Sequence, residues 1–91
     1  MKAKVVMYST AVCPYCIRAE QLLHRKGIAE IEKIRVDLQP QLRDEMIEKT
    51  GRRTVPQIYI NGQYVGGYDD LVSFDHAGKL ESLLAEQTSG E

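Results

Sequence analysis

The sequence predicts an α/β domain: a four-stranded mixed sheet with helices on both faces, in the order βαβα, then a β-hairpin, then helix. Short apolar runs of strand type alternate with stretches whose apolar residues recur at helical spacing. Glycine or proline stands at most boundaries between these segments. Asn61-Gly62 separates two strand-type runs, which is the strongest short-range signal for a hairpin.

The first half of the chain predicts two strand–helix pairs. Residues 4–8 form an apolar run typical of a buried strand, and Pro14 suits the first turn of the helix that follows. Residues 31–36 alternate as a weaker strand, and Pro40 begins a second helix. A strand–helix–strand unit implies a parallel pair of strands with a right-handed crossover.

The second half of the chain predicts a hairpin and then a helical segment that buries leucines along one face. The hairpin strands are residues 57–60 and 63–65, and the helical spacing continues to about Ala85. Gly78 interrupts this spacing, so one broken helix or two short helices are expected.

Length and charge limit the classes of function. The 91 residues suffice for one domain, which we place at residues 1–86 with a flexible tail at 87–91. Twelve basic and thirteen acidic residues leave a formal charge of -1, so neither nucleic acid nor an anionic membrane is an expected partner. No apolar stretch approaches the ~20 residues that span a bilayer, and the first apolar run is too short for a signal peptide. We therefore expect a cytoplasmic protein.

Cys13 and Cys16 are the only cysteines, and their placement indicates redox chemistry. Cys13 falls at the N-terminal end of the predicted first helix, where unpaired N–H groups and the helix dipole favour the nucleophilic thiolate. Cys16 lies one turn later on the inner face, close enough to close a disulfide but less exposed. A disulfide that closes so short a loop constrains the unfolded chain little and therefore adds little stability. Cys-x-x-Cys next to a βαβ pattern is typical of a thioredoxin-like redox site.

The alternative function of this cysteine pair is to supply two of the ligands of a zinc site. A structural zinc ion needs four ligands, and the chain has no second cysteine pair. Its two histidines, His24 and His76, are too far apart in the sequence for a zinc-ligand spacing. We therefore expect no bound metal.

Three motifs, in this order, resemble those of dithiol glutaredoxins. They are Cys13-Pro14-Tyr15-Cys16, Thr54-Val55-Pro56 and Gly66-Gly67-Tyr68-Asp69-Asp70. The likeness runs from about Lys4 to Leu84, and it implies a thioredoxin-like fold. It also implies an oxidoreductase of electron transport and cell redox homeostasis that binds no cofactor and uses glutathione as its reducing cosubstrate. Thioredoxins, with Trp-Cys-Gly-Pro-Cys, and monothiol glutaredoxins, with Cys-Gly-Phe-Ser, are less similar.

The resemblance assigns glutathione binding to the second motif. In that family its proline is cis and faces the nucleophilic cysteine. The preceding residue, here Val55, pairs its backbone with the peptide part of glutathione. Tyr15 would form an aromatic wall against the ligand. Considered without the other motifs, the Thr54-Val55-Pro56 segment would only start an edge strand.

The third motif has two compatible explanations. In the local one, Gly67 makes the turn and Asp69 caps the next helix. The resemblance adds that Gly67, Asp69 and Asp70 bind glutathione. The N–H groups of Asp69 and Asp70 would receive its γ-glutamyl carboxylate, because helix N-termini bind anions. The side chain of Asp70 would accept from the α-ammonium group.

One position departs from the family pattern. Many glutaredoxins have a lysine three residues before the nucleophile, where it meets the glycine carboxylate, and this chain has Thr10 there. Arg52 and Arg53 are the nearest candidates to replace that cation. Alternatively, both belong to a solvated basic loop.

The reaction implied by the resemblance begins with attack by Cys13 on a mixed disulfide or a protein disulfide, which Cys16 then resolves. Expected partners are glutathione and proteins with glutathionylated or disulfide-bonded cysteines, ribonucleotide reductase being one candidate, and the chain is expected to be a monomer. Two alternatives stay open. One is a carrier of a 2Fe–2S cluster held between two chains by Cys13 and glutathione. The other is a thioredoxin-type electron donor reduced by a flavoprotein.

Overall fold

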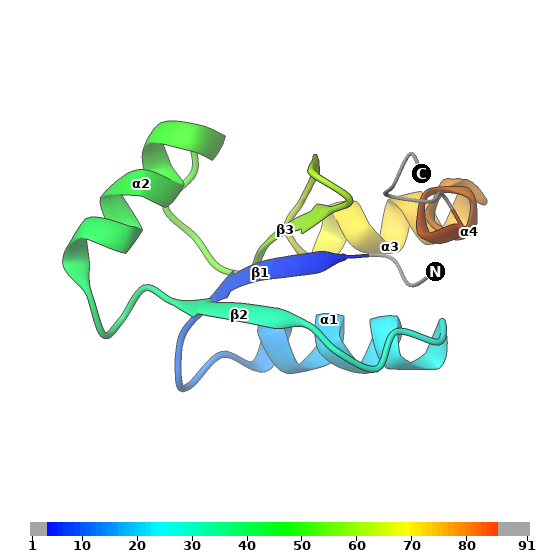
Figure 1. The fold of residues 1–91 in the computed structure, drawn as a ribbon, viewed down its shortest axis with the longest axis horizontal. Coiled ribbons are helices and arrows are strands. Elements are labelled where there is room, and N and C mark those ends of the chain that lie inside the picture. Colours follow the sequence, from blue (N-terminus) through cyan, green and yellow to red (C-terminus); the bar gives the residue numbers. More distant parts are fainter. Residues whose placement is uncertain (1–3, 86–91) are drawn as a thin grey trace.

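The computed structural model describes residues 4–85 and confirms the predicted order of elements (Figure 1). The strands are β1 (Val5–Ser9), β2 (Glu32–Arg35), β3 (Gln57–Ile60) and β4 (Gln63–Gly66). The helices are α1 (Pro14–Arg25), α2 (Pro40–Thr50), α3 (Tyr68–His76) and α4 (Lys79–Ala85). The predicted tail at 87–91 lies outside the described residues.

The four strands form one mixed sheet in the order β2-β1-β3-β4. β1 runs parallel to β2, with Met7 opposite Lys33, and antiparallel to β3, with Met7 opposite Ile58. β3 and β4 form the predicted hairpin, in which Tyr59 stands opposite Tyr64. Because β1 and β3 are antiparallel neighbours, the loop that follows β1 lies beside the loop that precedes β3.

Both faces of β1 are buried, by different helices. Val5 and Met7 belong to the larger hydrophobic cluster, which α1, α3 and α4 cover. Tyr8 points to the other face and packs with Val36 and Met46, the latter from α2. Figure 1 shows α1 and α2 on opposite sides of β1 and β2. The prediction of helices on both faces is confirmed.

Proline and glycine set the ends of several helices. Pro14 and Pro40 stand in the first turns of α1 and α2, where a missing N–H costs nothing. Gly78 has a φ of 77° and separates α3 from α4, so the last helical segment is two short helices. Within residues 4–85, no helix is long and apolar enough to cross a membrane.

Candidate functional site

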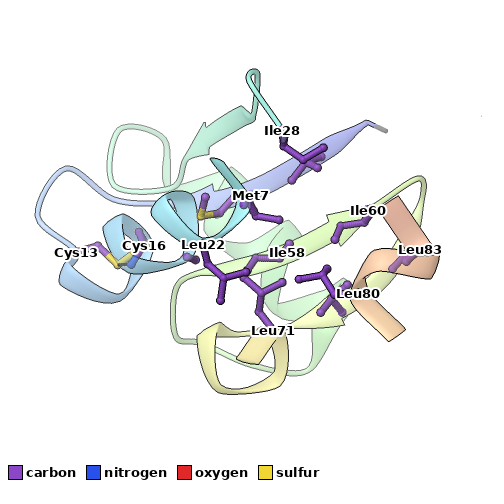
Figure 2. Close-up of a cluster of buried hydrophobic side chains, with 14 residues drawn as sticks. Met7, Cys13, Cys16, Leu22, Ile28, Ile58, Ile60, Leu71, Leu80 and Leu83 are labelled. Carbon is purple, nitrogen blue, oxygen red and sulfur yellow. Dashed lines mark hydrogen bonds between the residues drawn. A yellow bond between two sulfur atoms is a disulfide. The ribbon is translucent and has the colours of Figure 1, made fainter. Parts of the chain in front are cut away.

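The two cysteines form a disulfide at the start of α1, with Cα atoms 5.2 Å apart. Figure 2 shows this S–S bond at one end of the larger hydrophobic cluster, with Leu83 at the other end. Cys13 is 7% exposed and Cys16 is 6% exposed. The expected difference in exposure is therefore wrong for this disulfide-bonded form, because the bond draws both sulfurs into the same packed cluster.

The first turn of α1 supplies a hydrogen-bond donor to the sulfur of Cys13. Cys13 is the N-cap residue, and its Sγ accepts a hydrogen bond from the backbone N–H of Cys16 at 3.1 Å. The amide groups of this turn carry the positive end of the helix dipole. In the reduced protein the Cys16 N–H and the helix dipole would stabilise a thiolate at Cys13 more than a neutral thiol.

The segment before β3 packs against the disulfide. The Val55–Pro56 peptide bond is cis, as the resemblance implies. The carbonyl oxygen of Val55 lies 3.9 Å from the Sγ of Cys13, and Pro56 is buried. Val55 is part-buried and packs against both hydrophobic clusters, so this segment closes one side of the cysteine pair.

A groove of about 270 Å³ opens beside this segment, and we call it the ligand groove. Its lining residues are Tyr15, Arg52, Thr54, Val55, Pro56, Gly67, Tyr68, Asp69 and Asp70. The fold thus brings together all seven residues that the sequence analysis assigned to glutathione, from three motifs separated along the chain. It also brings in one of the two candidate arginines.

Two aromatic rings form a wall of the ligand groove. Tyr15 is 53% exposed, and its ring centroid lies 5.8 Å from that of Tyr68. The guanidinium carbon of Arg18 lies 5.4 Å from the centroid of the Tyr15 ring, which places a positive charge over that ring. Tyr68 was not predicted from the sequence as a lining residue. Its position inside the third motif was the available signal.

Asp70 makes two contacts at the start of α3. Its Oδ2 accepts from the backbone N–H of Gly67 at 2.9 Å and from Nη1 of Arg52 at 2.7 Å. These contacts, that of Gly67 first, hold the pKa of the Asp70 carboxyl below its usual range. Asp70 is therefore ionised at neutral pH and places a negative charge in the ligand groove.

The expectation that Asp69 caps α3 is wrong. The residue that reaches back is Asp70, because it stands three positions after the N-cap residue Gly67, the spacing of a capping box. The turn is also one residue earlier than expected. Gly66 has a φ of 123°, which favours glycine, whereas the φ of Gly67 is -89°.

The two candidate arginines have different environments. Arg52 lines the ligand groove and pairs with Asp70. Arg53 does not line the groove, and its backbone carbonyl accepts from the guanidinium of Arg43 at 3.2 Å. Of the two, Arg52 is the one placed to meet an anionic group of a ligand.

Thr10 lies on the other side of the disulfide. It lines a second hollow, of about 190 Å³, which Cys13 and Cys16 also line. Its hydroxyl donates to the carbonyl of Val12 at 3.3 Å, within the loop that follows β1. Thr10 therefore takes no part in the ligand groove.

Two other kinds of site are alternatives to this one among residues 4–85, a metal centre and a larger hollow. Within residues 4–85, no group of three or more His, Cys, Asp or Glu side chains is arranged to hold a metal ion. A hollow of about 590 Å³, larger than the ligand groove, lies beyond the C-terminal end of α1, beside Lys26, Ile28 and Leu84. Neither cysteine lines it.

Comparisons with known proteins identify related chains. Residues 5–65 match the family model described as Glutaredoxin. A glutaredoxin of Pseudomonas aeruginosa is 54% identical over 81 residues, which cover 89% of this chain and 95% of the relative. The solution structure of the dithiolic glutaredoxin 2-C-Grx1 from Trypanosoma brucei brucei has a TM-score of 0.81 and 45% identity, over 90% of this chain and 87% of that one. The crystal structure of a buckwheat glutaredoxin–glutathione complex has a TM-score of 0.82 and 30% identity, over 90% and 76%.

Proposed function

The chain belongs to the glutaredoxin family and has its thioredoxin-like fold, and we propose that it is a glutathione-dependent thiol–disulfide oxidoreductase. One observation carries the proposal. The Cys13–Cys16 disulfide stands at the start of α1, directly beside a groove lined by the other two motifs. The similar buckwheat glutaredoxin forms a complex with glutathione, which supports the same ligand for this groove.

The charges of the ligand groove complement a zwitterionic tripeptide. The Asp70 carboxylate attracts the α-ammonium group, and the N–H groups at the start of α3 attract the γ-glutamyl carboxylate. The Arg52 guanidinium uses Nη1 for Asp70, and its remaining N–H groups can donate to the second carboxylate. Val55 lies outside the ladder of β3 and offers its backbone to the peptide part in a strand-like pairing.

For a glutathionylated protein, the reaction consists of two thiol–disulfide exchanges. The Cys13 thiolate attacks the glutathione sulfur, a bond forms between these sulfurs, and the protein thiolate leaves and takes a proton from water. A thiolate of free glutathione then attacks the bound glutathione sulfur. Oxidised glutathione leaves, and the Cys13 thiolate is restored. No electron acceptor other than the substrate disulfide is needed.

For a protein disulfide, Cys16 takes part. The Cys13 thiolate first forms a mixed disulfide with one protein sulfur, and the other leaves as a thiolate. Cys16 then attacks the Cys13 sulfur, which releases the reduced protein and leaves the Cys13–Cys16 disulfide of this structure. Two glutathione molecules reduce that disulfide and become oxidised glutathione.

A coupled assay with glutathione, glutathione reductase and NADPH tests this function. We expect Cys13→Ser to abolish turnover of a glutathionylated peptide. Cys16→Ser should keep that turnover and lose reduction of a protein disulfide. An active Cys13→Ser variant would show that the nucleophile is misassigned, and reduction by a flavoprotein without glutathione would favour the thioredoxin-type alternative.

Purification without air separates this function from the cluster-carrier alternative. We propose that the chain works as a monomer, so a colourless monomer is expected. A coloured dimer whose absorption disappears when glutathione is removed would instead favour a shared iron–sulfur cluster.

A further inference from the structure

A chain of hydrogen bonds lies behind the ligand groove and centres on a buried polar side chain. Gln57, the first residue of β3, is 1% exposed. Its Nε2 donates to the carbonyl oxygen of Thr54 at 2.9 Å and lies 3.4 Å from the Thr54 hydroxyl. Its Oε1 accepts from the hydroxyl of Tyr64 at 2.5 Å. A buried amide with both ends bonded fixes the groups on either side of it.

The chemistry of these groups determines which one donates. A backbone carbonyl only accepts, so the amide nitrogen of Gln57 must face Thr54. The amide oxygen then faces Tyr64, whose hydroxyl has to donate. Burial raises the pKa of the Tyr64 hydroxyl, which keeps this proton in place.

The ring of Tyr64 is itself held in a row of aromatic rings. Its centroid lies 5.2 Å from that of Tyr59, and the Tyr59 centroid lies 6.4 Å from that of Tyr8 in β1. Such packing limits the positions that the Tyr64 hydroxyl can take. The hairpin therefore holds the Gln57 amide in one orientation.

The Thr54 carbonyl belongs to the same peptide unit as the Val55 N–H. This peptide is trans, since the cis bond is the following one. In a trans peptide the C=O and N–H groups point in opposite directions. Holding the Thr54 carbonyl against Gln57 therefore turns the Val55 N–H away from it. Val55 lines the ligand groove, and its N–H makes no hydrogen bond within residues 4–85.

We propose that Gln57, oriented by Tyr64, is a positioning residue for the tripeptide ligand, because it fixes the peptide plane that presents the Val55 N–H to the ligand groove. This inference rests on the proposed function, since the ligand is the peptide part of glutathione. Gln57 and Tyr64 line neither the ligand groove nor the hollow beside the cysteines, so they act through the Thr54–Val55 peptide.

Steady-state kinetics of a glutathionylated peptide test the inference in Gln57→Met and Tyr64→Phe. Gln57→Met keeps an unbranched side chain and removes the donor to Thr54. We expect its KM to rise about five- to tenfold with kcat nearly unchanged, because the lost interaction serves binding. Tyr64→Phe removes one oxygen and should raise KM about threefold. The double variant should match Gln57→Met, since both changes break one chain.

Tyr59→Phe is the matched control, because it deletes a hydroxyl from the neighbouring ring, outside this chain of hydrogen bonds. Its KM should stay at the wild-type value. A second readout is the backbone amide signal of Val55 in NMR spectra with S-methylglutathione, a non-reducing analogue. The analogue should shift this signal in the wild type and in Tyr59→Phe, and much less in Gln57→Met.

Unchanged KM values in Gln57→Met and Tyr64→Phe would overturn the inference and leave the proposed function intact, provided that the wild type uses glutathione. A fall in kcat without a rise in KM would also overturn it. If Gln57→Met does not fold, the KM of Tyr64→Phe still tests the inference, and an unchanged value overturns it. A wild-type protein that does not use glutathione overturns the proposed function itself, before any variant is measured.

Discussion

The backbone N–H of Cys16 donates to the Sγ of Cys13 across 3.1 Å, so the second cysteine of the pair supplies a donor to the first. One helical turn separates the two residues. That spacing allows the disulfide and also aims an otherwise unpaired helix N–H at the sulfur of the N-cap residue.

The pKa of the Cys13 thiol should lie well below the value of about 8.5 for a free cysteine. The helix N-terminus and the Cys16 N–H both favour the thiolate. The measurement is the ultraviolet absorbance of the thiolate against pH in Cys16→Ser, which keeps the backbone donor and cannot close the disulfide. Cys13→Ser with reduced Cys16 is the control. A Cys13 titration at or above 8.5 would contradict the role of the helix.

Arg52 and Arg53 should differ sharply in their effect on substrate binding. We expect Arg52→Gln to raise the KM for a glutathionylated peptide about tenfold, because it removes the cation that lines the ligand groove. Arg53→Gln is the matched control and should change KM less than twofold. The difference should shrink at high salt, which screens exposed charges. Equal effects of the two changes would indicate only a general basic surface.

Gly66→Ala should destabilise the fold more than Gly62→Ala. Both glycines have positive φ values, 123° and 83°, so both changes cost backbone strain of about 1 kcal/mol. At Gly62 a methyl group meets open space, whereas at Gly66 it overlaps the Asp70 carboxylate. We expect Gly66→Ala to lose at least about twice as much unfolding free energy as Gly62→Ala. We also expect KM to rise in Gly66→Ala and not in Gly62→Ala. Denaturant titration measures the first effect, and equal losses would contradict it.

Asp37 should contribute to stability at neutral pH and lose that contribution in acid. Arg35, together with the N–H of Ala11, holds the pKa of the Asp37 carboxyl at about 2, below its ordinary value of 3.8. A group whose pKa falls on folding stabilises the native state above its unfolded pKa. The wild type should therefore exceed Asp37→Asn in unfolding free energy above about pH 4, and this advantage should vanish as pH falls towards 2. A difference that does not depend on pH would contradict the ionic contribution.

The sequence predicts the fold well because local signals and tertiary packing agree. The alternation of Ile31 to Val36, the Asn61-Gly62 turn and the break at Gly78 each place an element that the structure confirms. The ligand groove was predictable for a different reason. Its residues come from three motifs, and the order of strands in the sheet brings their loops together beside Cys13.

Details that depend on a side chain's direction could not be predicted. Arg52 and Arg53 are adjacent, and only the path of the chain after α2 decides which one faces Asp70. The sequence predicted Asp69 as the capping carboxylate of α3, whereas the structure has Asp70. The residue at which the helix begins determines which carboxylate lies three positions after the N-cap, and that residue is hard to predict. Nothing local in the sequence indicates the hydrogen bond between Gln57 and Tyr64, since that contact needs the finished hairpin.

Mass spectrometry during titration with reduced and oxidised glutathione tests the central claim most directly, because it reports the adduct, the cysteine that carries it and the potential together. In Cys16→Ser we predict one glutathione bound through Cys13. In the wild type we predict interconversion between the dithiol and the Cys13–Cys16 disulfide at a potential near −200 to −230 mV, as in glutaredoxins. No adduct at Cys13, or a disulfide insensitive to glutathione, would contradict the account.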